Sequence, residues 1–117
     1  MTTDELKERT RLFSHRCLDV VDALPGKTSS RTLGNQLARS ATSVGANYRA
    51  ACRSRSKAEF IAKIGLVEEE ADECAFWLEM IHERKLIPAK RLEHLLKEAS
   101  ELTAIMAASR KTAKSTR

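Results

Sequence analysis

The chain has 117 residues, of which 42% are hydrophobic and 32% are charged, a balance that fits one packed domain and excludes a disordered chain. Its formal net charge of +5 and sequence pI near 9.4 favour an acidic partner only modestly. No apolar run approaches the ~20 residues of a membrane span, and the polar start MTTDELKERT does not resemble a signal peptide. We therefore expect a cytoplasmic protein with no membrane association.

The first two predicted helices are separated by a proline-glycine pair and a polar run. Apolar residues at steps of three, four and seven predict a helix over about residues 4–24, ending before Pro25. A second helix is predicted over about residues 30–52, with Ser29 and Ser30 as its N-terminal cap.

The second half of the chain predicts two longer helices. Ser56 and Glu59 have the spacing of a capping box, which begins a helix over about residues 57–86 with a heptad stripe of apolar residues. A fourth helix is predicted over about residues 88–109. Residues 111–117, KTAKSTR, hold no large apolar side chain and are expected to form a basic, flexible C-terminal tail.

No segment shows the alternation typical of a strand. Four amphipathic helices with short links pack best as an antiparallel up-down-up-down bundle. We therefore predict an all-α protein in which residues 1–110 form one four-helix bundle domain. The three cysteines, Cys17, Cys52 and Cys74, show no metal-binding spacing, and we interpret them as reduced core residues.

The second predicted helix has one positively charged face. On a helical wheel its apolar and basic stripes lie on nearly opposite arcs, and no Asp or Glu occurs from Ala23 to Ala58. A solvated surface is one interpretation, but a face of one sign built from arginine is also suited to phosphate or carboxylate. The candidate contacts with the backbone of RNA or DNA are Arg39, Arg49, Arg53, Arg55 and Lys57. Because no aromatic side chain accompanies them for base stacking, such binding would be weakly sequence-specific.

Small residues give the same helix a thin side. Gly45 costs about 1 kcal/mol relative to alanine inside a helix, and with Ala46 and Ala50 it would let a neighbouring helix approach closely. Asn47 lies beside the apolar arc. We interpret it as a structural amide whose hydrogen bonds are satisfied, or as a residue at a subunit contact.

The third predicted helix is strongly acidic. From Glu68 to Glu83 there are seven acids and no Lys or Arg. Large apolar side chains also lie outside its heptad stripe, where they are expected at protein contacts, although a locally wide bundle would hold them too. We predict a homo-oligomer with candidate interface residues Asn47, Leu66, Glu69, Glu73, Phe76 and Trp77. In this alternative to nucleic-acid binding, the arginines pair with acids of a neighbouring subunit.

Signals of catalysis are weak. Glu79 and His82 have the Glu-x-x-His spacing of di-iron bundles, but such a site needs two of these motifs. His15 and His94 have no ligand at metal-binding spacing, and there is no glycine-rich phosphate loop or nucleophile elbow. We expect a non-enzymatic protein with no metal, cofactor or small-molecule substrate.

The central part of the sequence holds a specific combination of short motifs. It consists of Gln36, Leu37, Arg39, Ala41, Ser43, Val44, Gly45, Ala46 and Asn47, followed by Arg55, Ser56, Lys57, Glu59 and Phe60. With these residues the chain resembles a bacterial four-helix bundle family that includes the 23S rRNA intervening-sequence proteins, and the resemblance extends from about Phe13 to Ile105. Many members of that family have proline at the position of Gly45 and read Ile-Ala-Glu-Gly where this chain has YRAA, which makes this chain more basic.

This resemblance implies an up-down four-helix bundle and a ring of five subunits. The chain is also similar to the accessory protein of diversity-generating retroelements, a basic pentameric bundle that works with a reverse transcriptase and nucleic acid. Neither relative implies catalysis.

Overall fold

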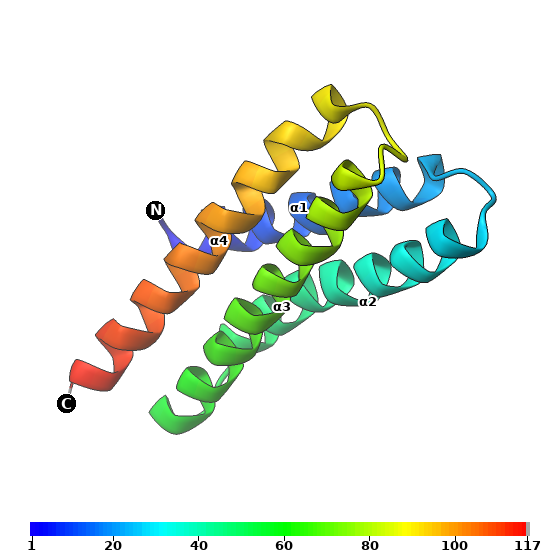
Figure 1. Cartoon of the computed structure of the whole chain (residues 1–117). Helices are drawn as coiled ribbons and strands as arrows, with labels where there is room; N and C mark the ends of the chain where they lie inside the picture. Colours follow the sequence, from blue (N-terminus) through cyan, green and yellow to red (C-terminus); the bar gives the residue numbers. More distant parts are fainter. Residues whose placement is uncertain (117) are drawn as a thin grey trace.

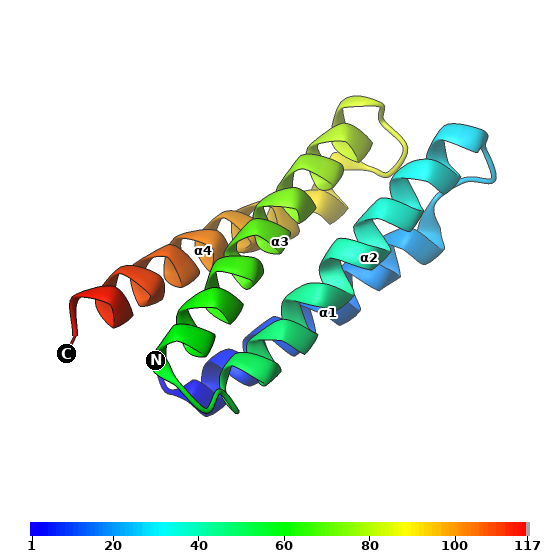
Figure 2. The same cartoon turned by 90° about the horizontal axis from the view of Figure 1, so that it is seen from below.

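In a computed structural model, which describes residues 1–116, these residues form four helices (Figure 1). They are α1 (Thr3–Ala23), α2 (Thr28–Ala51), α3 (Lys57–Glu83) and α4 (Ala89–Ser115). Consecutive helices pack against each other, and α4 returns to α1 in the least extensive of the helix contacts. Figure 2 shows the same four helices from below, with the pair α1 and α2 beside the pair α3 and α4. The predicted all-α up-down four-helix bundle is confirmed.

Three helix ends differ from the sequence-based expectation, one of them being the end of α3, which stops at Glu83 rather than at 86. The Ser29/Ser30 cap was wrong: α2 begins at Thr28 behind Lys27, which makes no side-chain cap, and Ser30 is buried within the helix. The last helix continues through Ser115 rather than ending at 109. Its last turns contain several alanines and no Gly or Pro, so helix propensity is sufficient to extend it. The flexibility expected for residues 111–117 stays a prediction.

Local hydrogen bonds fix both ends of α3. The predicted capping serine is confirmed, because the Ser56 side chain accepts a 3.0 Å hydrogen bond from the Glu59 N–H. The Glu59 carboxylate accepts from the N–H of Arg55, at 3.4 Å, rather than from that of Ser56. At the other end, Lys85 has a φ of 56°, and the N–H of Leu86 donates to the carbonyl of Ile81. This is the left-handed C-terminal motif that stops a helix.

Small and aliphatic side chains, together with Phe13 and Tyr48, fill the core. The heptad stripe predicted for α3 is buried from Ile64 to Ile81, although Phe60 at its start is only half-buried. Cys17 and Cys74 are buried free thiols, and Cys52 is half-buried. Contact with Cys17 and burial raise the pKa of the Cys74 thiol, so it stays protonated and behaves as a small apolar side chain.

The thin side predicted for the second helix is present where α2 meets α1. A Cβ atom added to Gly45 would lie 2.8 Å from Ser14 Oγ and 3.6 Å from the Cα of Arg11. Ser14 Oγ itself donates a 2.6 Å hydrogen bond to the carbonyl of Ala41. Glycine at this position therefore allows a close approach between the two helices.

The two glycines at positions 45 and 65 should respond differently to alanine. Gly65→Ala should raise the free energy of unfolding by up to about 1 kcal/mol, because the new Cβ meets only Arg110 Cδ at an ordinary 3.7 Å. Gly45→Ala should lose that gain, because Ser14 must move from its bond to Ala41. Urea denaturation compares the two variants, and equal gains would contradict the close approach at Gly45.

Arg9 of α1 forms hydrogen bonds with two carboxylates of α4. Its Nε and Nη2 donate to the Glu98 carboxylate at 2.7 and 2.6 Å, and Nη2 also donates to Glu101 at 2.9 Å. The hydrogen bond from Arg9 outweighs burial and lowers the pKa of Glu98 below its ordinary value of 4.5.

This pair should contribute to stability at neutral pH and lose its contribution in acid. The pKa of Glu98 is depressed in the folded state, so its contribution is present above the ordinary value and disappears as pH falls through the folded-state value. Arg9→Met should cost about 1 kcal/mol near pH 7, after allowance for solvent screening, and less near pH 3. Urea unfolding at both pH values measures the difference. A cost that does not change with pH would mean that lost packing, not charge, explains the effect.

Candidate nucleic-acid interface

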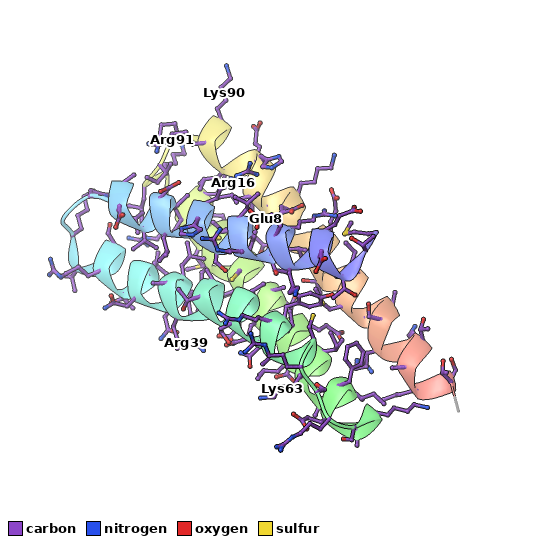
Figure 3. The ribbon with its side chains drawn as sticks, turned by 180° about the vertical axis from the view of Figure 1, so that it is seen from behind. Glu8, Arg16, Arg39, Lys63, Lys90 and Arg91 are labelled. Atoms are coloured by element: carbon purple, nitrogen blue, oxygen red, sulfur yellow. The ribbon has the colours of Figure 1, made fainter. Side chains whose placement is uncertain are left out.

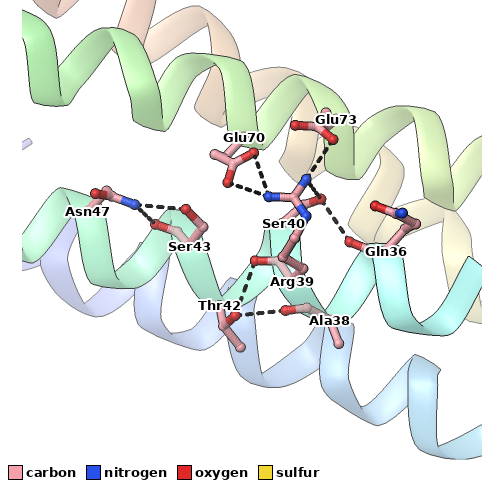
Figure 4. Close-up of polar contacts among 9 residues, drawn as sticks. All are labelled: Gln36, Ala38, Arg39, Ser40, Thr42, Ser43, Asn47, Glu70 and Glu73. Carbon is pink, nitrogen blue, oxygen red and sulfur yellow. Dashed lines mark hydrogen bonds and ion pairs between the residues drawn. The ribbon is translucent and has the colours of Figure 1, made fainter.

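Arg39 is tied to α3 of its own chain, as Figure 4 shows. Its Nη1 lies 3.1 Å from a carboxylate oxygen of Glu70, and its Nη2 lies 2.7 Å from Glu73. The hydrogen bond to Glu73 and the charges of both carboxylates raise the pKa of Arg39. This arginine is therefore paired with two acids within the subunit, and it contributes little free positive charge to the outer surface.

Glu70 is an acid beside the core that the helical wheel did not single out. It is only 6% exposed, and a buried carboxylate needs a cation or hydrogen bonds to remain charged. The signal was present in its spacing, because Glu70 follows Val67 by three residues and precedes Cys74 by four, which places it beside the core stripe. Its role here is to join α2 and α3 through Arg39.

The remaining predicted cations are available at the surface. Arg49, Arg53, Arg55 and Lys57 are all exposed, and none of them forms an ion pair within residues 1–116. The first three lie at the C-terminal end of α2 and in the turn that follows it. Lys57 lies elsewhere, at the edge of an apolar groove between α3 and α4.

Two adjoining hollows collect most of these cations. One, of about 280 Å³ between α1 and α2, is lined by Arg11, His15 and Arg49 over a floor that includes Gly45. The other, of about 500 Å³ between α2 and α3, is lined by Arg49, Arg53, Arg55 and Lys63. Ala46 and Arg49 line both. We call this surface the cationic groove and define it by six residues, five Arg or Lys and one His: Arg11, His15, Arg49, Arg53, Arg55 and Lys63.

Opposing charge in the cationic groove is small. Of the described residues that line the two hollows, the acidic one is Glu59, whose carboxylate accepts from the backbone N–H of Arg55. Arg11 also lies 3.9 Å from Glu8, but both side chains are largely exposed and such pairs are weak. In Figure 3, Lys63 reaches this side of the molecule from α3, while Arg16 lies on the side of α4. The groove is thus a concave surface with a large excess of positive charge.

Arg11, His15 and Lys63 were missed because they come from other helices. Arg11 and His15 are one turn apart on α1, which the sequence does reveal. A wheel drawn for one helix cannot say which neighbour that face adjoins. The close approach at Gly45 determines that neighbour, since it brings α1 next to the arginine-bearing half of α2.

The predicted interface residues fall into two groups. Leu66 is 38% and Phe76 is 51% exposed, and Glu69 is also exposed on α3. Glu73 already pairs with Arg39 inside the subunit. These residues, with Leu66 and Phe76 ten positions apart, share one outward face of α3.

Trp77 and Asn47 are less accessible. Trp77 is half-buried, packs edge-on against Phe76 with ring centroids 4.9 Å apart, and has an indole N–H without a hydrogen-bond partner among the described residues. The side-chain amide of Asn47 donates to the carbonyl and hydroxyl oxygens of Ser43 at 3.0 and 2.7 Å. These bonds lie within α2, in keeping with a structural amide.

Two further properties concern the whole described chain. Across residues 1–116, no three His, Cys, Asp or Glu side chains gather in a way that could hold a metal ion. None of the helices in this range combines the length and apolar character that crossing a membrane would need.

Together, the helices and the cationic groove define a small all-α four-helix bundle protein with a basic concave surface. The family model described as 23S rRNA-intervening sequence protein matches residues 4–108, and the chain belongs to this family. It is similar to a solved structure of a protein of unknown function from the S23 ribosomal protein family of Bacteroides thetaiotaomicron. The two share 27% sequence identity with a TM-score of 0.86, over 95% of this chain and 99% of the other. No curated protein matches the chain.

Proposed function

We propose that this protein is a non-enzymatic binding module that holds the phosphate backbone of a nucleic acid in the cationic groove. The observation that carries the proposal is the convergence of Arg11, His15, Arg49, Arg53, Arg55 and Lys63 on two adjoining hollows. Arginine suits this role because its guanidinium group donates to two phosphate oxygens at once.

The dimensions of the groove fit several phosphates. The groove extends from Thr42 along α2 to Arg53 in the turn that follows, a span of about 16 Å at ~1.5 Å per residue. One strand of a duplex places a phosphate about every 3.4 Å along its axis, so roughly four or five phosphates match this length. The floor of glycine and alanine leaves space for the backbone to approach the helix.

The binding should be governed by charge rather than by base sequence. No Phe, Tyr or Trp lines the two hollows among the described residues, so His15 is the one aromatic ring there on which a base could stack. Contacts with phosphates fix position on a nucleic acid but do not read its sequence.

Fluorescence anisotropy with labelled RNA hairpins, duplex DNA and single strands tests the proposal. At ~50 mM salt we expect binding to at least one of these, with affinity falling as salt rises with a slope of about −4 on logarithmic axes. Absence of binding to all three at ~50 mM salt would refute it.

A second candidate function is that of a structural homo-oligomer. It is favoured by Leu66 and Phe76, which are exposed on one face of an otherwise acidic helix, since large apolar side chains cluster at subunit contacts. The family resemblance implies a ring of five, so light scattering would give five times the 13.1 kDa chain mass. In that case Phe76→Ser should lower the mass. A monomeric wild-type protein would contradict this candidate. If the assembly persists in Arg49→Glu/Arg53→Glu, it does not depend on pairing between these arginines and acids of a neighbouring subunit.

A further inference from the structure

A buried hydroxyl in the first turn of α2 has no hydrogen-bond partner. Ser30 is only 2% exposed, and its Oγ bonds to none of the described residues. A buried polar group without a partner costs free energy, and a serine on a helix can avoid that cost by donating to the carbonyl four residues before it. Ser40 does this, at 2.8 Å from the carbonyl of Gln36. The Ser30 hydroxyl is therefore a donor that the described chain does not use.

The backbone beside Ser30 also has donors without acceptors. The first backbone N–H of α2 to find a carbonyl is that of Arg31, which donates to Lys27 at 3.0 Å. The N–H groups of Thr28, Ser29 and Ser30 have no acceptor among the described residues, because the helix has no side-chain cap. Free N–H groups and the helix dipole both favour an anion at such a position.

Ser30 lines a hollow of about 250 Å³ between the turn that follows α1 and the first two turns of α2. Two exposed polar side chains of α2, Arg31 and Asn35, line it as well. None of its lining residues is acidic, and the nearest acids of α1 in sequence, Asp19 and Asp22, do not line it. Its remaining lining is largely apolar and includes Val21, Leu24 and Pro25.

Arg31 has charge to offer a ligand in this hollow. It forms no ion pair within residues 1–116, and its Nη2 donates only a 3.3 Å hydrogen bond to the hydroxyl of Thr28. The hollow thus combines a guanidinium group, a buried hydroxyl and an uncapped helix end. Each of these donates to the oxygens of a phosphate group.

The hollow and the cationic groove lie toward opposite ends of α2. Arg31 precedes Arg49 by 18 residues, which at ~1.5 Å per residue is about 27 Å. The turn between α1 and α2 lies at the end of the bundle away from the N-terminus (Figure 1). Since screening limits the reach of exposed charges to about 10 Å at 0.1 M salt, a ligand in the hollow is held by the hollow's own residues.

We propose that this hollow binds a phosphate group, either as free inorganic phosphate or as the terminal phosphate of a small metabolite. Ser30 and Arg31 donate to its oxygens, and the uncapped start of α2 complements its charge. The hollow is smaller than the ~300 Å³ at which sites for drug-sized ligands begin, so the ligand is a phosphate with at most a few carbon atoms. This site does not depend on nucleic-acid binding in the cationic groove.

Amide chemical-shift titration with inorganic phosphate and with glycerol 3-phosphate tests the proposal. At a constant ionic strength of about 0.15 M, signals of residues 26–35 should shift and saturate with a Kd on the order of 1 mM. Tighter binding of glycerol 3-phosphate would identify a metabolite as the source of the phosphate, and tighter binding of inorganic phosphate would identify the free anion. Arg49→Glu/Arg53→Glu/Arg55→Glu should bind both probes as wild type does, even if the cationic groove holds no nucleic acid.

Two serines of the first turn supply a matched pair of variants. Ser30→Ala should raise the Kd for phosphate at least about tenfold, because it removes a hydrogen bond to a charged group. Ser29→Ala, in the same turn but outside the lining of the hollow, should stay within about twofold of wild type. In phosphate-free buffer Ser30→Ala should not lower the urea midpoint, since the lost hydroxyl has no partner in the fold. Arg31→Gln, a change at an exposed position, should raise the Kd at least about fivefold.

Four results would overturn the proposal. They are the absence of saturable shifts at residues 26–35 with either probe, the same shifts on addition of chloride alone, a Ser30→Ala variant that binds phosphate like wild type, and a Ser30→Ala variant that is less stable in phosphate-free buffer. The last result would mean that the hydroxyl serves the fold rather than a ligand.

Discussion

Reversal of three arginines, Arg49→Glu/Arg53→Glu/Arg55→Glu, should reduce nucleic-acid binding at least about 100-fold at ~100 mM salt. These side chains line the larger hollow of the cationic groove and have no ion-pair partner among the described residues. Each reversal replaces an attraction to phosphate with a repulsion. The salt slope should become shallower by about one for each arginine that no longer binds a phosphate, and anisotropy titrations over a range of salt concentrations measure both quantities.

A matched variant separates the groove from net charge. Arg16→Glu/Arg84→Glu/Arg91→Glu changes the net charge by the same amount at exposed positions outside the groove. It should retain most of the binding, since screening limits the reach of exposed charges to about 10 Å at 0.1 M salt. Circular dichroism should show that both variants remain helical. Equal reductions of affinity in the two variants would mean that binding follows total charge, and the groove would have no special role.

Phe13→Ala should be the most destabilising single change considered, whereas Phe76→Ala should be close to neutral in the monomer. Phe13 is 1% exposed in the core and Phe76 is 51% exposed on α3. Loss of a buried aromatic side chain costs about 3–5 kcal/mol, while an exposed position changes stability by about 0.5 kcal/mol or less. Urea unfolding of both variants gives the comparison.

The phenylalanine pair also reports on assembly. If Phe76 lies in a subunit contact, its truncation should lower the melting temperature in a way that depends on protein concentration. A large loss of stability at all concentrations would instead place Phe76 in the folding core of one subunit. Similar small effects for Phe13 and Phe76 would contradict the packing described for α1.

The four-helix bundle was predictable from the sequence because the apolar residues of each segment recur with the period of an α-helix. The buried side chains from Ile64 to Ile81 on α3 are those that the heptad pattern indicated, and Gly45 does allow a close helix contact. The capping role of Ser56 was also predictable, since it depends on residues three apart. These features are local, or follow from which face of a helix is apolar.

The candidate site was less predictable because it depends on how faces meet. Arg39 belongs to the basic stripe by spacing, but Glu70 and Glu73 on α3 occupy it. Arg11 and Lys63 join Arg49 only through the packing of α1 and α3 on either side of α2. The end of α4 was predicted too early, at residue 109, because the pattern of large apolar residues stops near that position. The alanine-rich sequence around it continues the helix to Ser115.

Amide chemical-shift mapping during titration with a duplex nucleic acid tests the central claim most directly. Backbone signals from residues 11–15, 42–55 and 59–63 should move together, since these segments form the cationic groove. Signals of the acidic stretch Glu68–Glu83 should stay in place. Shifts confined to other surfaces, such as the last turn of α4, or no shifts at nucleic-acid excess in low salt, would contradict a phosphate-binding groove.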